Sequence, residues 1–267
     1  MKTHEIQEVD LASFCYLNNK RYPFLLESVN HNENNRYSIL FAFPQESIVL
    51  KKLNDFDFLN EIDRRHKEEN KNLDLPFTGG WFTYLSYELI AQIEPVLAPQ
   101  LHKSNLPIAF AVRIPSAIYI DHKTGKTFIY DEEDNNSRIN QILEDINTIE
   151  EIPNKAINGV IFEENEEKFL NGVNKSLNYI FEGDVFQVNL SRKWTFNLSS
   201  ILDSSIIYNK LKKVNPAPFS ALIQFEGFSI ISSSPERLFK SANGVLETRP
   251  IAGTHPRGKG DLDIIQK

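Results

Sequence analysis

The sequence has little of several features that would assign it to a class of proteins. It has one cysteine, Cys15, among 267 residues, which excludes an intramolecular disulfide and a zinc site built on cysteines. No run of about 18 apolar residues occurs, so a membrane-spanning helix is not expected. The net charge is −7, and a negative field does not favour binding to nucleic acid or to an anionic membrane.

Other absences narrow the choice further. No repeat with a period of about 20 to 50 residues is present, which argues against solenoids and propellers. The phosphate-binding pattern G-x-x-x-x-G-K-[ST] does not occur, and the 6 histidines show no H-x-x-x-H spacing, so we predict no metal site among them. The beginning, "MKTHEIQEVDLASF", is polar and acidic, unlike a secretory signal. These features predict a soluble, cytoplasmic protein that binds neither nucleic acid nor membrane.

The apolar content, 41%, is enough for a substantial core. Strands are expected at "PFLLESV" and "RYSILFAF", and "SAIYIDHKTGKTFIYDEE" predicts a hairpin that turns near Gly125. Helices are expected over residues 55–73, 165–184 and 204–215. The first would have Phe58, Leu59 and Ile62 on its apolar side, and Gly183 would end the second. A strand follows the second helix at "VFQVNLSRKWTF". Two more, "FSALIQF" and "FSIISSS", follow the third around the turn residues Glu226 and Gly227. This order predicts an α+β fold with largely antiparallel sheets.

A polar stretch that loses apolar residues around Pro153 indicates the best domain boundary, near residues 150–158. We therefore predict one region over residues 1–150 and a second over residues 151–267.

One candidate for chemistry is Glu236 in "SSSPERLF", which follows a strand beside a proline-fixed turn. A carboxyl group in that place can be half-buried, with a raised pKa, and can act as a proton donor. The alternative is a solvated glutamate in a turn, paired with Arg237.

A second candidate is "LETRPIAGTHPRGKGD", which is too irregular for a helix and too rich in glycine for an interior strand. Backbone N–H groups at Gly253 and Thr254, with the Thr254 hydroxyl, can bind a carboxylate or a phosphate. The alternative is an exposed loop with solvated charges.

Two further segments are less specific when each is taken alone. In "NPAPFSALI" the prolines would end a helix at Asn215 and form a rigid wall before a strand, or simply mark a turn. In "PFLLESVN", Ser28 either closes a pocket or caps a turn.

Taken in order, six segments resemble landmarks of the chorismate-utilising enzymes, specifically component I of aminodeoxychorismate synthase and of anthranilate synthase. They are "LLES", "GGWFTYLSYE", "GDVFQVNLSRKW", "NPAPFSALI", "SSSPER" and "ETRPIAGTHPRG". Asn189, Ala217, Phe219 and Arg237 resemble the aminodeoxychorismate branch. Ala252 resembles anthranilate synthases and some members of the other branch, and it cannot replace the nucleophilic lysine that one subset carries there.

The resemblance implies that chorismate is aminated with glutamine-derived ammonia to 4-amino-4-deoxychorismate, for 4-aminobenzoate and folate synthesis. Glu236 would protonate the departing 4-hydroxyl group as a general acid. Ala252, Gly253 and Thr254 would bind chorismate. The implied partner is a glutamine amidotransferase, component II, and the implied cofactor is Mg²⁺, with its ligands in a C-terminal part beyond Lys267.

The resemblance also implies an N-terminal pocket for L-tryptophan. Ala217 replaces the serine of the feedback-regulated pattern, which leaves regulation open. The family fold is a two-layer sandwich with large antiparallel sheets flanked by helices. The positions that match the pocket are Ser28, Arg36, Tyr37, Ser38, Ile39, Pro218, Phe219 and Ser220.

Because family members are longer, we expect this chain to be an N-terminal portion, either a fragment or a natural truncation, and to be inactive alone. Two alternatives stay open: component I of anthranilate synthase in tryptophan synthesis, and a non-catalytic module. Such a module would keep the tryptophan pocket and the surface that contacts the amidotransferase.

Overall fold

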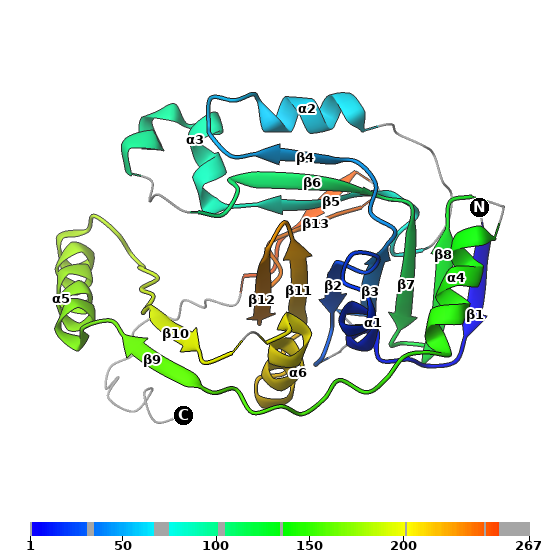
Figure 1. Cartoon of the computed structure of the whole chain (residues 1–267). Coiled ribbons are helices and arrows are strands. Elements are labelled where there is room, and N and C mark those ends of the chain that lie inside the picture. Colours follow the sequence, from blue (N-terminus) through cyan, green and yellow to red (C-terminus); the bar gives the residue numbers. More distant parts are fainter. Residues whose placement is uncertain are drawn as a thin grey trace, which may run out of the picture.

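The computed structural model describes residues 2–30, 35–66, 75–100, 105–133, 136–200, 202–242 and 244–250. Every strand pairing in these ranges is antiparallel. A large sheet and a smaller one pack together, and helices cover the outer side of each (Figure 1). The predicted class, α+β with large antiparallel sheets flanked by helices, is confirmed.

The larger sheet has 7 strands in the order β1-β8-β7-β3-β2-β11-β12. This order brings β11, from late in the chain, beside β2, from its beginning, and Ser220 pairs with Glu27 there. The strands are β1 (Lys2–Ile6), β2 (Phe24–Glu27), β3 (Tyr37–Ala42), β7 (Ser116–Asp121), β8 (Lys126–Asp131), β11 (Phe219–Phe225) and β12 (Phe228–Ser234).

The smaller sheet, in the order β4-β6-β5, packs on one face of the larger sheet. The contact is aromatic: the ring of Phe24 stacks on Phe82 with centroids 4.1 Å apart, and Phe110 stacks on Phe225 at 4.2 Å. Successive side chains of a strand point to opposite faces, so Leu25 faces away from this contact. The strands are β4 (Ser47–Leu50), β5 (Gly80–Leu85) and β6 (Ala109–Ile114).

Helices cover the other face of the larger sheet, where Leu25 is fully buried with Phe14 and Tyr208. These helices are α1 (Leu11–Leu17), α4 (Ser137–Ile146) and α6 (Ser204–Val214). The smaller sheet is covered by α2 (Phe58–Arg65), through buried Phe58. Three short helices, η1 (Tyr87–Leu89), α3 (Ile90–Ile93) and η2 (Pro95–Gln100), lie between β5 and β6. In the described ranges, no helix has the length and apolar content that crossing a membrane requires.

A third part, β9 (Gly159–Glu163), α5 (Glu166–Glu182) and β10 (Trp194–Leu198), lies to one side of the larger sheet (Figure 1). The strands β9 and β10 pair with each other. All residues of both strands are exposed, and α5 has no buried residue. This part therefore adds little to the core of the described chain. A hairpin of β13 (Lys240–Ala242) and β14 (Val245–Glu247) follows β12.

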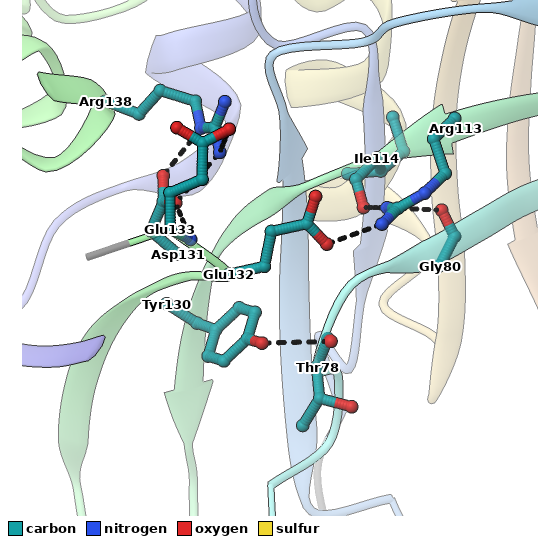
Figure 2. A network of polar contacts seen from close by, with 9 residues as sticks. All are labelled: Thr78, Gly80, Arg113, Ile114, Tyr130, Asp131, Glu132, Glu133 and Arg138. Atoms are coloured by element: carbon teal, nitrogen blue, oxygen red, sulfur yellow. Dashed lines mark hydrogen bonds and ion pairs between the residues drawn. The ribbon is translucent and has the colours of Figure 1, made fainter. Parts of the chain in front are cut away.

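The chain crosses from the smaller sheet to the larger one directly after β6, and Arg113 stabilises this corner (Figure 2). Its guanidinium donates to the carbonyl oxygens of Ile114 at 2.5 Å and Gly80 at 3.3 Å, and to Glu132 Oε2 at 2.5 Å. Gly79 has φ of 82°, and a Cβ atom there would lie 2.5 Å from Glu132 Oε2. Glycine is therefore favoured at position 79 by backbone conformation, and any side chain there would displace the Glu132 carboxylate.

Two further contacts stabilise the same corner (Figure 2). The Tyr130 hydroxyl donates to the carbonyl oxygen of Thr78 at 2.9 Å. Arg138 of α4 donates two hydrogen bonds to Asp131, at 2.7 and 3.0 Å, and pairs with Glu133 at 3.0 Å. These bonds connect the segment before β5, the end of β8 and the beginning of α4.

Several local predictions are confirmed. The hairpin between β7 and β8 contains Gly125 with φ of 69°, and that between β11 and β12 turns at Glu226 and Gly227, with φ of 40° and 86°. The second predicted helix is α5, which ends at Gly183 with φ of 85°, and the third is α6, which ends before Asn215.

Other local predictions are wrong. The predicted strand "VFQVNLSRKWTF" is irregular as far as Lys193, and β10 begins at Trp194. The first predicted helix is present as α2 over Phe58–Arg65, with residues 67–73 outside the described ranges, but Leu59, assigned to its apolar side, is 41% exposed. The sequence also did not predict β1 or α1, because β1 alternates polar side chains and α1 is only 7 residues long. The boundary near residues 150–158 stays a prediction, although β11 and β12 share a sheet with β2.

Candidate functional site

The ends of four neighbouring strands meet at one edge of the larger sheet. The end of β2 pairs with the beginning of β3 at Leu26 and Ile39, and with the beginning of β11 at Glu27 and Ser220. The beginning of β11 in turn pairs with the end of β12. This edge carries the residues predicted for a tryptophan pocket. We call them the strand-end cluster: Ser28, Arg36, Tyr37, Ser38, Ile39, Pro218, Phe219 and Ser220.

Two serines at the centre of the cluster are fixed by hydrogen bonds. Ser38 is fully buried, and its Oγ accepts the backbone N–H of Ser28 at 3.0 Å. The same oxygen lies 2.7 Å from Nε2 of His122. Ser28 Oγ donates to the carbonyl oxygen of Tyr37 at 2.9 Å. The ends of β2 and β3 are therefore connected by side chains as well as by the sheet.

Arg36 forms the charged part of the cluster. Its Nε and Nη2 donate to the two carboxylate oxygens of Asp121 at 2.7 and 2.6 Å, and its guanidinium lies over the Tyr37 ring, 4.7 Å from the centroid. Asp121 also accepts from Thr124 Oγ1 at 3.0 Å and from the N–H of Lys123 at 3.1 Å. The hydrogen bonds from Arg36, followed by those from Thr124 and Lys123, lower the pKa of Asp121 to about 2.

The third strand of the cluster is held through Ala217. Its carbonyl oxygen accepts the N–H groups of Val29 at 3.1 Å and Asn30 at 3.4 Å, and the hydroxyl of Ser220 at 3.2 Å. Ala217 is 5% exposed. The beginning of β11 is thus connected to the segment after β2.

The sequence did not predict two residues of this site, Asp121 and His122. Asp121 is the last residue of β7 and pairs with Tyr37 in the register of β3 and β7, and His122 follows it in the turn before β8. The hairpin itself was predicted, but its place beside β3 depends on the strand order, which no local pattern contains.

Glu236 follows the end of β12, at the same edge of the sheet as the cluster. Its side chain is exposed, not half-buried as the sequence suggested. Its backbone N–H donates to Ser234 Oγ at 3.4 Å, and that hydroxyl donates to the carbonyl oxygen of Glu236 at 3.1 Å. Arg237 forms an ion pair with Glu247 of β14. The strand-end position of Glu236 is therefore as expected, while its exposure is not.

The predicted chorismate-binding residues Ala252, Gly253 and Thr254 lie outside the described residues, so their assignment stays a prediction. Within the described ranges no group of three or more His, Cys, Asp or Glu side chains could hold a metal ion. The Mg²⁺ that the resemblance implies therefore stays a prediction, and we derive no step through it. Cys15 is buried, and burial raises the pKa of its thiol far above the ordinary value.

The chain is similar in sequence to several known proteins. A family model of chorismate binding enzymes matches residues 21–264. Anthranilate synthase component 1 of Bacillus pumilus is 29% identical over 264 residues, 89% of this chain and 50% of the relative. Aminodeoxychorismate synthase component 1 of Bacillus subtilis (strain 168) is 33% identical over 206 residues, 72% of this chain and 43% of the relative. The chain spans about half the length of the relatives it matches.

The fold also matches a solved structure. The crystal structure of anthranilate synthase component I from Streptococcus pneumoniae TIGR4 superposes with a TM-score of 0.64 at 23% identity, over 92% of this chain and 60% of that one. This likeness concerns the fold. Because the family model extends over nearly all of the sequence, the chain belongs to the family of chorismate binding enzymes.

Proposed function

We propose that this chain is part of component I of an aminodeoxychorismate synthase. In this proposal chorismate reacts with glutamine-derived ammonia to give 4-amino-4-deoxychorismate, the precursor of 4-aminobenzoate and folate. The main support is that Glu236 lies at the end of β12, at the same edge as the strand-end cluster. The relative of that name from Bacillus subtilis is 33% identical over 206 residues, and Asn189, Ala217 and Arg237 resemble that branch.

The proposed reaction needs a proton donor. The 4-hydroxyl of chorismate leaves poorly unless it is protonated, and Glu236 would supply that proton as the general acid. Its exposed side chain is accessible to a substrate at the strand end. Gly253 and Thr254 would bind a substrate carboxylate through backbone N–H groups and the hydroxyl.

The proposal includes two further participants. A glutamine amidotransferase, component II, would deliver the ammonia. Mg²⁺ would neutralise a substrate carboxylate, with ligands outside the described residues.

We further propose that the strand-end cluster binds L-tryptophan. The support is the convergence of its members from three separate segments and their fixed hydrogen bonds through Ser28 and Ser38. Buried Ala217 stands where the feedback-regulated pattern has serine. The proposal therefore concerns binding, and a regulatory effect would need its own test.

Anthranilate synthase is the second candidate, and two observations favour it. Ala252 resembles that branch, and the Bacillus pumilus relative of that name matches 89% of this chain. The test is to incubate the whole gene product with chorismate, Mg²⁺ and ammonium and to separate the products by chromatography. We expect 4-amino-4-deoxychorismate, and a dominant fluorescent anthranilate peak would favour the second candidate.

A further inference from the structure

His122 lies beside the strand-end cluster, in the turn that follows β7. Its backbone N–H donates to the carbonyl oxygen of Arg36 at 2.9 Å, so this turn is attached to the residue before β3. Its ring is half-buried, and Nε2 lies 2.7 Å from Oγ of Ser38. Neither the resemblance nor the proposed reaction assigns a role to His122.

The Ser38 hydroxyl decides how the imidazole takes part in this contact. A hydroxyl has one proton and two lone pairs, and one lone pair accepts the N–H of Ser28 at 3.0 Å. In the part of the chain that the structure describes, His122 Nε2 is the only other group hydrogen-bonded to this hydroxyl. Ser38 is fully buried, so its proton needs an acceptor. The hydrogen bonds therefore call for a neutral imidazole that carries its proton on Nδ1 and accepts at Nε2.

The carboxylate next to the imidazole is engaged elsewhere. Asp121 accepts two hydrogen bonds from Arg36, one from Thr124 Oγ1 and one from the N–H of Lys123. The charge of Asp121 is thus balanced by that of Arg36. Asp121 therefore does not hold His122 in its charged form.

Ser28 is the residue that these bonds fix in place. It is 6% exposed and follows Glu27, the last residue of β2, so it lies just beyond the paired part of the strand. Its hydroxyl donates to the carbonyl oxygen of Tyr37 at 2.9 Å, and its N–H donates to Ser38 Oγ. Of these two bonds to β3, the second depends on the orientation of the Ser38 hydroxyl, and hence on the imidazole.

We propose that His122 is a positioning residue of the strand-end cluster. Its neutral imidazole accepts the Ser38 hydroxyl proton at Nε2, and this bond keeps a lone pair of Ser38 Oγ directed at the Ser28 N–H. The end of β2 is thereby held in the geometry in which it binds a ligand. The effect on binding rests on the proposed binding of L-tryptophan at this cluster, whereas the hydrogen bonds form without a ligand.

The first test uses the chain without ligand, at about pH 8, where imidazole side chains are ordinarily neutral. Long-range ¹H–¹⁵N NMR spectra identify the protonated ring nitrogen of His122, which we expect to be Nδ1. Hydrogen exchange measures the protection of the Ser28 N–H. His122→Leu offers no acceptor to Ser38 and should speed this exchange by about tenfold, the effect of one lost hydrogen bond. His122→Gln should restore most of the protection, because its amide oxygen can accept the hydroxyl.

The second test measures the affinity for L-tryptophan by calorimetry. His122→Leu should weaken binding by about tenfold, and His122→Gln much less. In a Ser38→Ala background His122→Leu should have no further effect, since the hydroxyl that it positions is absent. The matched control is Ser116→Ala, which also removes a fully buried hydroxyl of the larger sheet, one that donates to the carbonyl oxygen of Tyr130 at 2.8 Å. It should change neither the affinity nor the exchange of Ser28, and far-UV circular dichroism would verify that each variant is folded.

The proposal is overturned if neutral His122 carries its proton on Nε2, or if His122→Leu leaves the exchange of Ser28 unchanged. It is also overturned if His122→Gln is as damaging as His122→Leu, or if tryptophan binds the wild type and His122→Leu equally well. A wild-type chain that binds no tryptophan would contradict the proposed ligand of the cluster instead. The protonated nitrogen and the exchange rates would then still decide the role of His122.

Discussion

Asp121 is the residue whose charge most directly supports the strand-end cluster. It is 5% exposed and accepts two hydrogen bonds from Arg36, and these bonds lower its pKa to about 2, below the ordinary 3.8. A carboxyl group whose pKa is lower in the folded state stabilises that state above the unfolded pKa. The stabilisation is lost as the pH falls toward the folded pKa.

We therefore expect Asp121→Asn to lower the free energy of unfolding by about 2 kcal/mol at pH 7. This difference from the wild type should narrow as the pH falls from about 4 toward 2, since Asp121 becomes protonated there. Urea unfolding at several pH values measures it. The control is Glu5→Gln, which breaks the exposed ion pair between Glu5 and Lys126. It should change the free energy of unfolding by less than about 1 kcal/mol. A difference for Asp121→Asn that stays constant with pH would contradict the account.

Glu236 carries the proposed acid catalysis. In the whole gene product, Glu236→Gln should lower the turnover of chorismate by about 10²- to 10⁴-fold, the usual contribution of a general acid. Because the side chain is exposed, the fold should not change. Steady-state kinetics would measure the turnover, and thermal unfolding would show whether the fold is unchanged. Near-normal turnover would contradict the role as general acid and would favour the alternative, that Glu236 is a solvated residue in a turn.

Gly79, before β5, and Gly125, between β7 and β8, show how single glycines determine the backbone next to a strand. Gly79 and Gly125 both have positive φ, 82° and 69°, but a Cβ atom at Gly125 has nothing within 4 Å, whereas one at Gly79 meets Glu132 at 2.5 Å. Moving Glu132 away would break its hydrogen bond from Arg113. Both glycines therefore adopt a backbone conformation with positive φ, but only at Gly79 would a Cβ atom also meet another side chain.

We expect Gly125→Ala to cost about 1 kcal/mol from the left-handed conformation alone. Gly79→Ala should cost at least about 1 kcal/mol more, because it also disrupts a hydrogen bond to a charged group. Urea unfolding gives both values. In a Glu132→Ala background the cost of Gly79→Ala should fall to that of Gly125→Ala. An equal cost in both backgrounds would show that the contact with Glu132 does not matter.

At the level of helices and strands, local sequence patterns correctly predicted turns and a helix end, because local contacts determine these features. Gly125 marked one hairpin and Gly227 another, because both adopt positive φ in tight turns. Gly183 marked the end of α5 for the same reason. The alternating residues of "VFQVN" did not give a strand, since no neighbouring strand pairs with them in the described chain.

The site depended on contacts far apart in sequence. Ser28 and the segment before β11 were predicted from their resemblance to family landmarks, and the sheet does bring them to one edge. His122 and Asp121 were missed because their neighbours, Ser38 and Arg36, come more than 80 residues earlier, at separations of 84 and 85. Long-range pairing of this kind follows from the strand order of the larger sheet.

At the scale of the whole molecule, the exposed large apolar side chains of the described residues are concentrated in residues 159–198, which contain β9, α5 and β10. Phe181 is 93% exposed, and Val160, Phe162, Leu177 and Trp194 of the same part are each more than half exposed. Exposed apolar patches of this kind favour association. We expect the chain in isolation to bind a hydrophobic dye, and its apparent mass in light scattering to rise with concentration.

Phe181→Ser should reduce both signals. Tyr87→Ser, at a residue 79% exposed on η1, is the control and should change them much less. A chain that stays monomeric over the whole accessible concentration range and binds no dye would contradict this prediction.

The central claim, that the whole protein aminates chorismate at the 4-position, is tested most directly by the fate of labelled nitrogen. The whole gene product would be incubated with chorismate, Mg²⁺ and ¹⁵N-ammonium, and the product examined by NMR for the carbon that bears the ¹⁵N label. We predict the label on the carbon that carried the 4-hydroxyl group, and a strongly reduced yield with Glu236→Gln. Label at the ring position of an anthranilate amino group, or no incorporation, would contradict the account.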